Sequence, residues 1–222
     1  RDSVYPGPQE DQVPQAFSMD DNGNQALAQL GLIVIHIGYR GGSMFRGKNF
    51  YNFGYGNLRD YPLADCKFAI EQLADRYAYI DRDRVGIYGH SGGGMMAAAA
   101  ILTYPDFFKV AVAASGNYDN NIYTKWWGEM YHGVKMKVKK DADGIKKYIF
   151  ESKIPTIMEL AANLKGKLLL VTGDMDINVH PANTFRLANA LIKADKLFDM
   201  MVIPGADHSI DSPYYFNLLR HY

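Results

Sequence analysis

The sequence of 222 residues is poor in features that mark several common classes of protein. It has one cysteine, Cys66, so no disulfide can form within the chain. No apolar run approaches the ~20 residues that a membrane-spanning helix needs. Basic and acidic residues number 24 each, so no basic excess suggests binding to nucleic acid or to an anionic membrane. What remains is a globular chain with an ordinary hydrophobic content of 48%.

Cofactor-binding patterns are missing as well. No cysteine and histidine residues have the spacing of a metal site, and no dinucleotide-binding glycine pattern occurs. We therefore expect neither a metal nor an organic cofactor. The length fits one sizeable domain, residues 1–222. Cys66 falls within a helical pattern, which favours a buried structural thiol.

Apolar runs and helical periodicity indicate the fold class. Five apolar runs predict strands, at residues 32–37, 85–88, 108–114, 167–172 and 198–203. Helical patterns are expected at 24–30, 62–77, 95–102, 157–164 and 183–194, and from 211 onward. Alternation of this kind is typical of an α/β protein with an open, mostly parallel sheet and helices on both faces.

Two long segments, residues 38–59 and 115–150, have no clear periodicity, so we expect irregular structure there. The run at 32–37 is bounded by glycines and apolar throughout, which favours a strand covered on both faces. In an open parallel sheet, the functional site lies at the carboxyl ends of the strands.

The segment 84–94, Arg-Val-Gly-Ile-Tyr-Gly-His-Ser-Gly-Gly-Gly, is the strongest local signal. Its Gly-x-Ser-x-Gly motif follows a predicted strand directly and precedes a predicted helix, which is the context of a nucleophile elbow. The flanking glycines allow the strained backbone that such a turn requires. The first amides of the following helix can face a developing negative charge. Ser91 is therefore the predicted nucleophile.

A serine nucleophile needs a base, and the base needs an orienting carboxylate. On this fold the three follow in the order Ser, Asp or Glu, then His. His208 comes after the last predicted strand and is the expected base, whereas the other histidines, His90 in the elbow included, are expected to be structural. Asp174 and Asp176 both follow the strand at 167–172, and position alone does not separate them.

Four segments together resemble a known family. They are Val-Tyr-Pro-Gly-Pro at 4–8, Gly-His-Ser-Gly-Gly at 89–93, Asp-Ile-Asn-Val-His at 176–180 and Asp-His-Ser at 207–209. In this order they resemble the catalytic domain of the prolyl oligopeptidase family of serine peptidases, within the α/β-hydrolase fold and closest to its dipeptidyl peptidase IV branch. The resemblance spans nearly the whole chain.

The resemblance implies roles for further residues. It favours Asp176 over Asp174 as the catalytic carboxylate, because the branch has its aspartate two residues before Asn-Val-His. The Tyr5 hydroxyl would donate a hydrogen bond to the oxyanion, and the backbone N–H of Gly92 would be the second donor.

The same resemblance implies a substrate pocket. Asn178 would hold a substrate backbone carbonyl, and Val179 and Tyr123 would form walls of a proline-sized pocket. Tyr118 would add a wall from the segment 115–121. The branch usually reads Gly-Trp-Ser-Tyr-Gly around its serine, whereas Gly92 leaves that wall open here, so the preference for proline is left open.

The predicted function is that of a serine peptidase working through an acyl-enzyme on peptide substrates. Release of dipeptides with a proline or small-residue preference is the finer expectation. A carboxylesterase on the same fold is an alternative, although residues 36–42 do not form its His-Gly-Gly-Gly oxyanion segment. A second alternative is an inactive binding module, which the intact serine, aspartate and histidine disfavour.

Further implications concern a longer protein. In the family, a β-propeller precedes the catalytic domain, and none of it is among these residues, so we expect the chain to be a fragment. The upstream domain would decide between exopeptidase and endopeptidase action. The family resemblance also suggests a homodimer and a secreted or periplasmic location.

Overall fold

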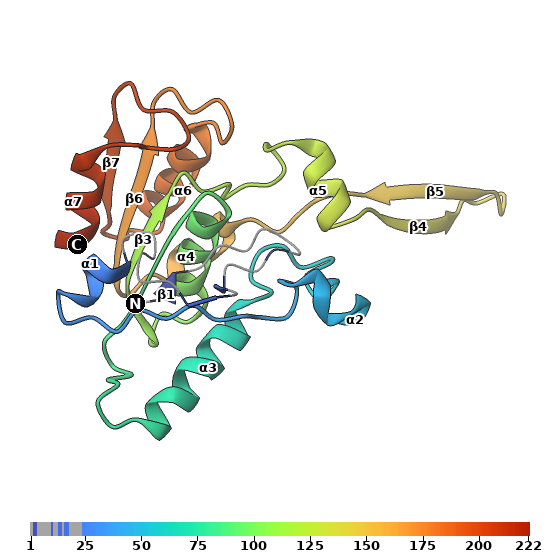
Figure 1. The fold of residues 1–222 in the computed structure, drawn as a ribbon. Coiled ribbons are helices and arrows are strands. Elements are labelled where there is room, and N and C mark those ends of the chain that lie inside the picture. Colours follow the sequence, from blue (N-terminus) through green and yellow to red (C-terminus); the bar gives the residue numbers. More distant parts are fainter. Residues whose placement is uncertain (1, 4–9, 11–12, 15, 18–23) are drawn as a thin grey trace.

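The computed structural model describes residues 2–3, 10, 13–14, 16–17 and 24–222. At its centre, five strands form a sheet in the order β1 (Asp2–Ser3), β2 (Val85–His90), β3 (Phe108–Ala114), β6 (Lys167–Gly173) and β7 (Asp199–Ile203) (Figure 1). Every neighbouring pair is parallel. This confirms the predicted open parallel sheet and four of its five predicted strands.

Helices cover both faces of the sheet. One face is covered by α4 (Gly92–Thr103), α3 (Leu63–Arg76), α6 (Ala182–Lys193) and the 3-10 helix η2 (Ile157–Asn163), and a single core cluster joins their buried side chains. The other face packs against α7 (Pro213–His221). In Figure 1, α7 lies on the opposite side of the strands from α3 and α4. The predicted two-sided arrangement is therefore confirmed.

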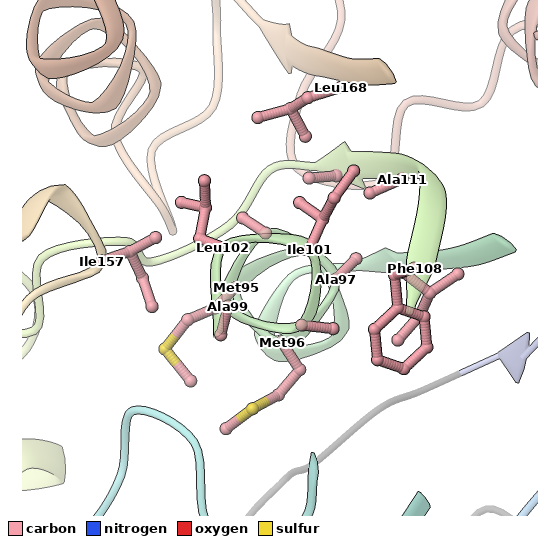
Figure 2. Close-up of a cluster of buried hydrophobic side chains, with 14 of the residues drawn as sticks. Met95, Met96, Ala97, Ala99, Ile101, Leu102, Phe108, Ala111, Ile157 and Leu168 are labelled. Atoms are coloured by element: carbon pink, nitrogen blue, oxygen red, sulfur yellow. The ribbon is translucent and has the colours of Figure 1, made fainter. Parts of the chain in front are cut away.

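The helix α4 is buried on all sides. Every residue from Gly92 to Leu102 is buried, as expected for a helix with no polar face. Figure 2 shows Met95, Met96 and Leu102 pointing in different directions from the helix, with Phe108, Ala111, Leu168 and Ile157 around it. Burial of each large apolar side chain contributes roughly 1.5–3 kcal/mol. Packing on all sides thus fixes the position of the helix and of the turn that leads into it.

The apolar run at 32–37 does not form the predicted strand. Only Ile35 makes an isolated bridge, and Leu32 and Ile33 are 37% and 42% exposed. A strand forms only where a neighbouring strand continues its hydrogen-bonded ladder. The neighbour of β2 on one side is β1, whose two described residues pair with it in register. Ile35 and Ile37 nevertheless pack against the core. The prediction of a strand covered on both faces is therefore wrong, because residues 32–37 are exposed or only partly buried and form no ladder.

The segment 115–150 is more regular than predicted. It contains α5 (Lys125–Tyr131) and the strand β4 (Lys135–Lys140), which pairs antiparallel with β5 (Lys146–Glu151). This hairpin projects away from the domain (Figure 1). Lysines alternate with apolar residues along most of β4, and alternation of that kind suits a strand. The segment 38–59 likewise contains η1 (Met44–Arg46) and α2 (Lys48–Tyr51).

Two smaller points complete the fold. Cys66 is a free, buried thiol on α3, as predicted. The helix α1 (Asn24–Ala28) is short and buries Leu27. In the part of the chain that the structure describes, no helix combines the length and apolar character needed to cross a membrane.

Candidate active site

The turn between β2 and α4 holds Ser91 in a strained backbone conformation. Its φ of 59° and ψ of −123° lie in a region that non-glycine residues rarely adopt. The Ser91 N–H donates to the Ala114 carbonyl at 2.8 Å, and the Ser91 carbonyl accepts from the Met95 N–H at 3.0 Å. A central strand and a buried helix therefore hold the turn from both sides. This is the geometry expected of a nucleophile elbow.

The third glycine of the run, Gly94, has a structural reason of its own. A Cβ at this position would lie 2.2 Å from the Ala114 carbonyl oxygen, which is backbone and has no freedom to move aside. The first turn of α4 therefore packs directly against the end of β3. Gly94 lies outside the Gly-x-Ser-x-Gly motif, so motif matching alone gave it no role.

Three residues from different loops meet at the carboxyl ends of the strands. His208 Nε2 lies 2.9 Å from Ser91 Oγ, and His208 Nδ1 lies 2.8 Å from Asp176 Oδ2. Ser91 follows β2, Asp176 follows β6, and His208 follows β7. The structure thus brings together the predicted nucleophile, base and carboxylate in one hydrogen-bonded line.

The two candidate aspartates have different surroundings. The Asp176 side chain is fully buried, and its Oδ1 accepts hydrogen bonds from the backbone N–H groups of Asn178 and Val179 at 3.0 and 2.8 Å. Its other oxygen is therefore left for His208. Asp174 is exposed and accepts from the Gly205 N–H at 2.6 Å. Asp174 thus ties two loops together, whereas Asp176 faces the histidine.

Close backbone packing sets the distance between the aspartate and histidine loops. A Cβ on Gly173 would lie 2.3 Å from the Ala206 carbonyl oxygen and 2.7 Å from that of Asp207. The Met175 N–H also donates to the Ala206 carbonyl at 3.0 Å. Gly173 therefore lets the loop after β6 lie against the loop after β7. Sequence analysis missed this residue, although a glycine directly before the first aspartate was a visible signal.

Two of the expected substrate-binding residues contact one another. The Tyr123 hydroxyl donates to Asn178 Oδ1 at 3.0 Å. The Tyr123 ring packs edge-on against Trp127, with 5.7 Å between the ring centroids. Asn178 is exposed and Tyr123 is half-buried. Both side chains are therefore accessible, and Asn178 is joined through its backbone to Asp176.

The other two expected pocket walls lie inside the protein. Tyr118 is 1% exposed, and its hydroxyl donates to the Ala113 carbonyl at 3.0 Å. Burial raises the pKa of the Tyr118 hydroxyl. The Tyr118 side chain packs in the core cluster, and its role as a pocket wall stays a prediction. Val179 is 2% exposed, and its backbone N–H holds Asp176.

Of the two expected oxyanion donors, the structure describes only the Gly92 amide. Tyr5 lies outside the described residues. Gly92 is the first residue of α4 and is buried. The first N–H groups of a helix have no acceptor within that helix, so the Gly92 amide is free of intrahelical pairing. Among the described residues, no group of three or more His, Cys, Asp or Glu side chains could hold a metal ion.

One neighbour of the site was not predicted. The rings of His90 and His208 lie 4.9 Å apart between centroids, with their planes at 55°. Burial, followed by the charge of His208, lowers the pKa of His90 to about 4. In the sequence, the only indication that His90 lies near the site was its position directly before the nucleophile.

Known proteins resemble this chain along nearly its whole length. The model of the prolyl oligopeptidase family matches residues 17–218. Dipeptidyl peptidase 8 of Homo sapiens is 31% identical over 211 residues, which cover 95% of this chain and 23% of that protein. Prolyl endopeptidase FAP of Mus musculus is 29% identical over 210 residues, which cover 94% of this chain and 26% of that protein.

A solved structure agrees with these relatives. The crystal structure of Porphyromonas gingivalis dipeptidyl peptidase 4 matches with a TM-score of 0.82 and 28% identity. The match covers 99% of this chain and 30% of that one. The chain therefore spans less than a third of the length of these proteins.

Proposed function

Because the chain belongs to the prolyl oligopeptidase family, we propose that it hydrolyses peptide bonds with Ser91 as nucleophile, His208 as general base and Asp176 as the orienting carboxylate. The observation that carries the proposal is the continuous hydrogen-bonded line from Asp176 through His208 to Ser91, with steps of 2.8 and 2.9 Å. The strained elbow at Ser91 and the burial of Asp176 support it further.

The geometry suits acyl transfer. An ionised carboxylate only accepts hydrogen bonds, so His208 carries its proton on Nδ1 and presents a bare Nε2 to the Ser91 hydroxyl. His208 takes that proton as Ser91 Oγ attacks the substrate carbonyl, and then gives it to the departing amine. Water, activated by the same nitrogen, releases the acyl group. The buried charge of Asp176 stabilises the imidazolium during both steps.

The oxyanion would form beside the first turn of α4. The amide of Gly92 is placed there by the helix, and the partial positive charge of the helix N-terminus favours an anion at this point. Tyr5 is proposed as the second donor on the family resemblance. Losing one such donor costs about 2.7–4 kcal/mol of transition-state stabilisation, so Tyr5→Phe should lower kcat by roughly 10²–10³ with KM little changed. Unaltered turnover in this variant would remove Tyr5 from the mechanism.

For the substrate, we propose a peptide from which dipeptides are released, with proline or a small residue next to the cleaved bond. The relatives and the solved structure described above are dipeptidyl peptidases and a prolyl endopeptidase, which supports this class. Tyr123 and Asn178 are accessible beside Asp176 and could hold the substrate backbone and side chain. A preceding β-propeller, a homodimer and a secreted or periplasmic location remain family-based proposals for a longer protein.

Covalent labelling tests the nucleophile. A fluorophosphonate probe should label the wild-type protein and the Ser152→Ala control, because Ser152 is an exposed serine outside the site. The Ser91→Ala variant should not be labelled and should lose turnover by roughly 10⁶, the scale seen when a triad serine is removed. Equal labelling of Ser91→Ala would exclude Ser91.

Substrate choice tests the reaction class. A dipeptidyl-prolyl amide and a short-chain ester are compared at equal enzyme concentration. Amide hydrolysis that depends on Ser91 supports the peptidase. Hydrolysis of the ester alone would support a carboxylesterase, and labelling without turnover of either would leave the peptidase proposal without support.

A further inference from the structure

We propose that His90 is a positioning residue for His208, whose ring it holds in line between Ser91 and Asp176. The inference rests on the function proposed above, because it gives His90 a task in that reaction. It starts from the contact between the two rings, whose centroids lie 4.9 Å apart. Nothing in the motif itself requires a histidine at this position.

The two hydrogen bonds of His208 leave one motion of its ring free. Its Nδ1 and Nε2 are bonded to Asp176 and Ser91, and the hydrogen-bonding direction of an imidazole nitrogen lies in the plane of its ring. They resist rotation within that plane, but they allow the ring to tilt about the line that joins the two nitrogens. A neighbouring ring packed against the imidazole restricts this tilt. The His90 ring is such a neighbour, with its plane inclined at 55° to that of His208.

The element that carries His90 is a strand that has a partner on each side in the sheet. His90 is the last residue of β2, pairs with Ala114 of β3 and directly precedes Ser91. The nucleophile and the support for the base therefore move together. His208 itself lies on a loop after β7, and its side chain is 21% exposed. A base on a surface loop gains most from a fixed neighbour.

The charge state of His90 fits this role. The groups that act on it are His208, which follows β7, and Asp176, which follows β6. Burial and the charge of His208 lower its pKa to about 4, while Asp176 and a hydrogen bond to the His208 backbone oppose the shift. His90 is therefore neutral near pH 7. When His208 becomes an imidazolium during the reaction, its neighbour adds no repulsion.

Three variants test the proposal, each prepared in the longest form of the protein that can be purified. His90→Ala removes the ring contact, whereas His90→Phe keeps a ring and removes the ionisable nitrogens. His132→Phe is the matched control, because burial lowers the pKa of His132 as it does that of His90, but His132 lies after α5. Thermal unfolding is measured for each, so that loss of fold is separated from loss of position.

We expect His90→Ala to lower kcat and the rate of fluorophosphonate labelling about 10- to 100-fold, the scale of a misplaced catalytic group, with KM within about twofold. His90→Phe should keep most of the wild-type rate, and His132→Phe should match the wild type. The acid side of the pH profile adds a signature. The wild-type labelling rate should fall with a slope of about one proton and steepen toward two below about pH 4, whereas His90→Phe should keep a slope of one.

Two results would overturn the proposal. One is a His90→Ala variant that is labelled and turns over at the wild-type rate. The other is a loss that follows the unfolding midpoint in both His90 variants, with no recovery in His90→Phe. A wild-type protein that the probe does not label is a different outcome, because it removes the proposed function, and the role of His90 with it.

Discussion

The carboxyl end of the sheet and the hairpin of β4 and β5 both hold paired charged groups, but the two sets differ in their exposure to water. At the sheet, the carboxylate of Asp176 is fully buried and has three partners, His208 and two backbone N–H groups. On the hairpin, Lys137 and Glu151 form an ion pair at 2.6 Å, but their side chains are 59% and 47% exposed. The carboxylate has a partner in both places, but it is buried at the sheet and exposed to water on the hairpin.

The glycines of the two regions repeat this contrast. A Cβ added to Gly94 or Gly173 at the sheet would lie 2.2 or 2.3 Å from a backbone carbonyl oxygen, whereas a Cβ added to Gly144 between β4 and β5 would have nothing within 4 Å. Close packing makes the site intolerant of added atoms, because neighbouring backbone has nowhere to move. The hairpin has water around it and can adjust. Substitutions should therefore have large effects at the sheet and small ones on the hairpin.

The largest expected effect separates the two aspartates. Asp176→Asn should lower turnover on the order of 10⁴, because an amide in place of the carboxylate favours the wrong histidine tautomer. Asp174→Asn should cost far less, since among the described residues that side chain bonds only the Gly205 amide. Steady-state kinetics of both variants decide the matter. The reverse ranking would mean that the carboxylate was misassigned.

Matched glycine variants come next. Gly94→Ala should destabilise the fold by about 3 kcal/mol or more, because the new methyl group meets the fixed carbonyl of Ala114. Gly144→Ala should cost only about 1–2 kcal/mol, since its φ of +79° is unfavourable for alanine although the space is open. Urea denaturation measures both. Equal losses would show that the two turns are packed alike.

Acid should weaken the site region gradually. The pKa of His90 is lowered to about 4 in the folded state, from about 6.5 when unfolded, so the unfolded chain binds the proton first. Stability is therefore lost as the pH falls from about 6.5 toward 4. The unfolding midpoint of His90→Phe should depend less on pH across this window. A pH dependence identical to that of the wild type would mean that His90 does not contribute.

The smallest expected effect lies on the hairpin. Lys137→Ala removes the ion pair that lowers the pKa of Glu151. Exposed pairs contribute little, because water screens the attraction and two long side chains must be ordered. The unfolding midpoint and kcat should stay within experimental error of the wild type. A clear loss of either would show that the hairpin is coupled to the domain.

Local pattern predicted much of the fold because secondary structure follows local rules. Apolar runs located four strands of the sheet, and the Gly-x-Ser-x-Gly context located the turn that holds Ser91 in its strained conformation. The pattern failed at 32–37, where an apolar run packs on the core without forming a strand. An apolar run indicates a tendency toward burial, whereas strand pairing depends on a neighbour from elsewhere in the chain.

The sequence by itself determined the fold class, the elbow and the loops that carry the polar residues of the site. Position in the sequence left Asp174 and Asp176 open, and the family resemblance favoured Asp176. The tertiary structure placed Asp176 against His208, Tyr118 in the core and the His90 ring beside His208. His208 and Ser91 are 117 positions apart, and His208 and Asp176 are 32 apart. Such distances are set by how loops pack on one another, as Gly173 packs against Ala206, and no local pattern encodes that contact.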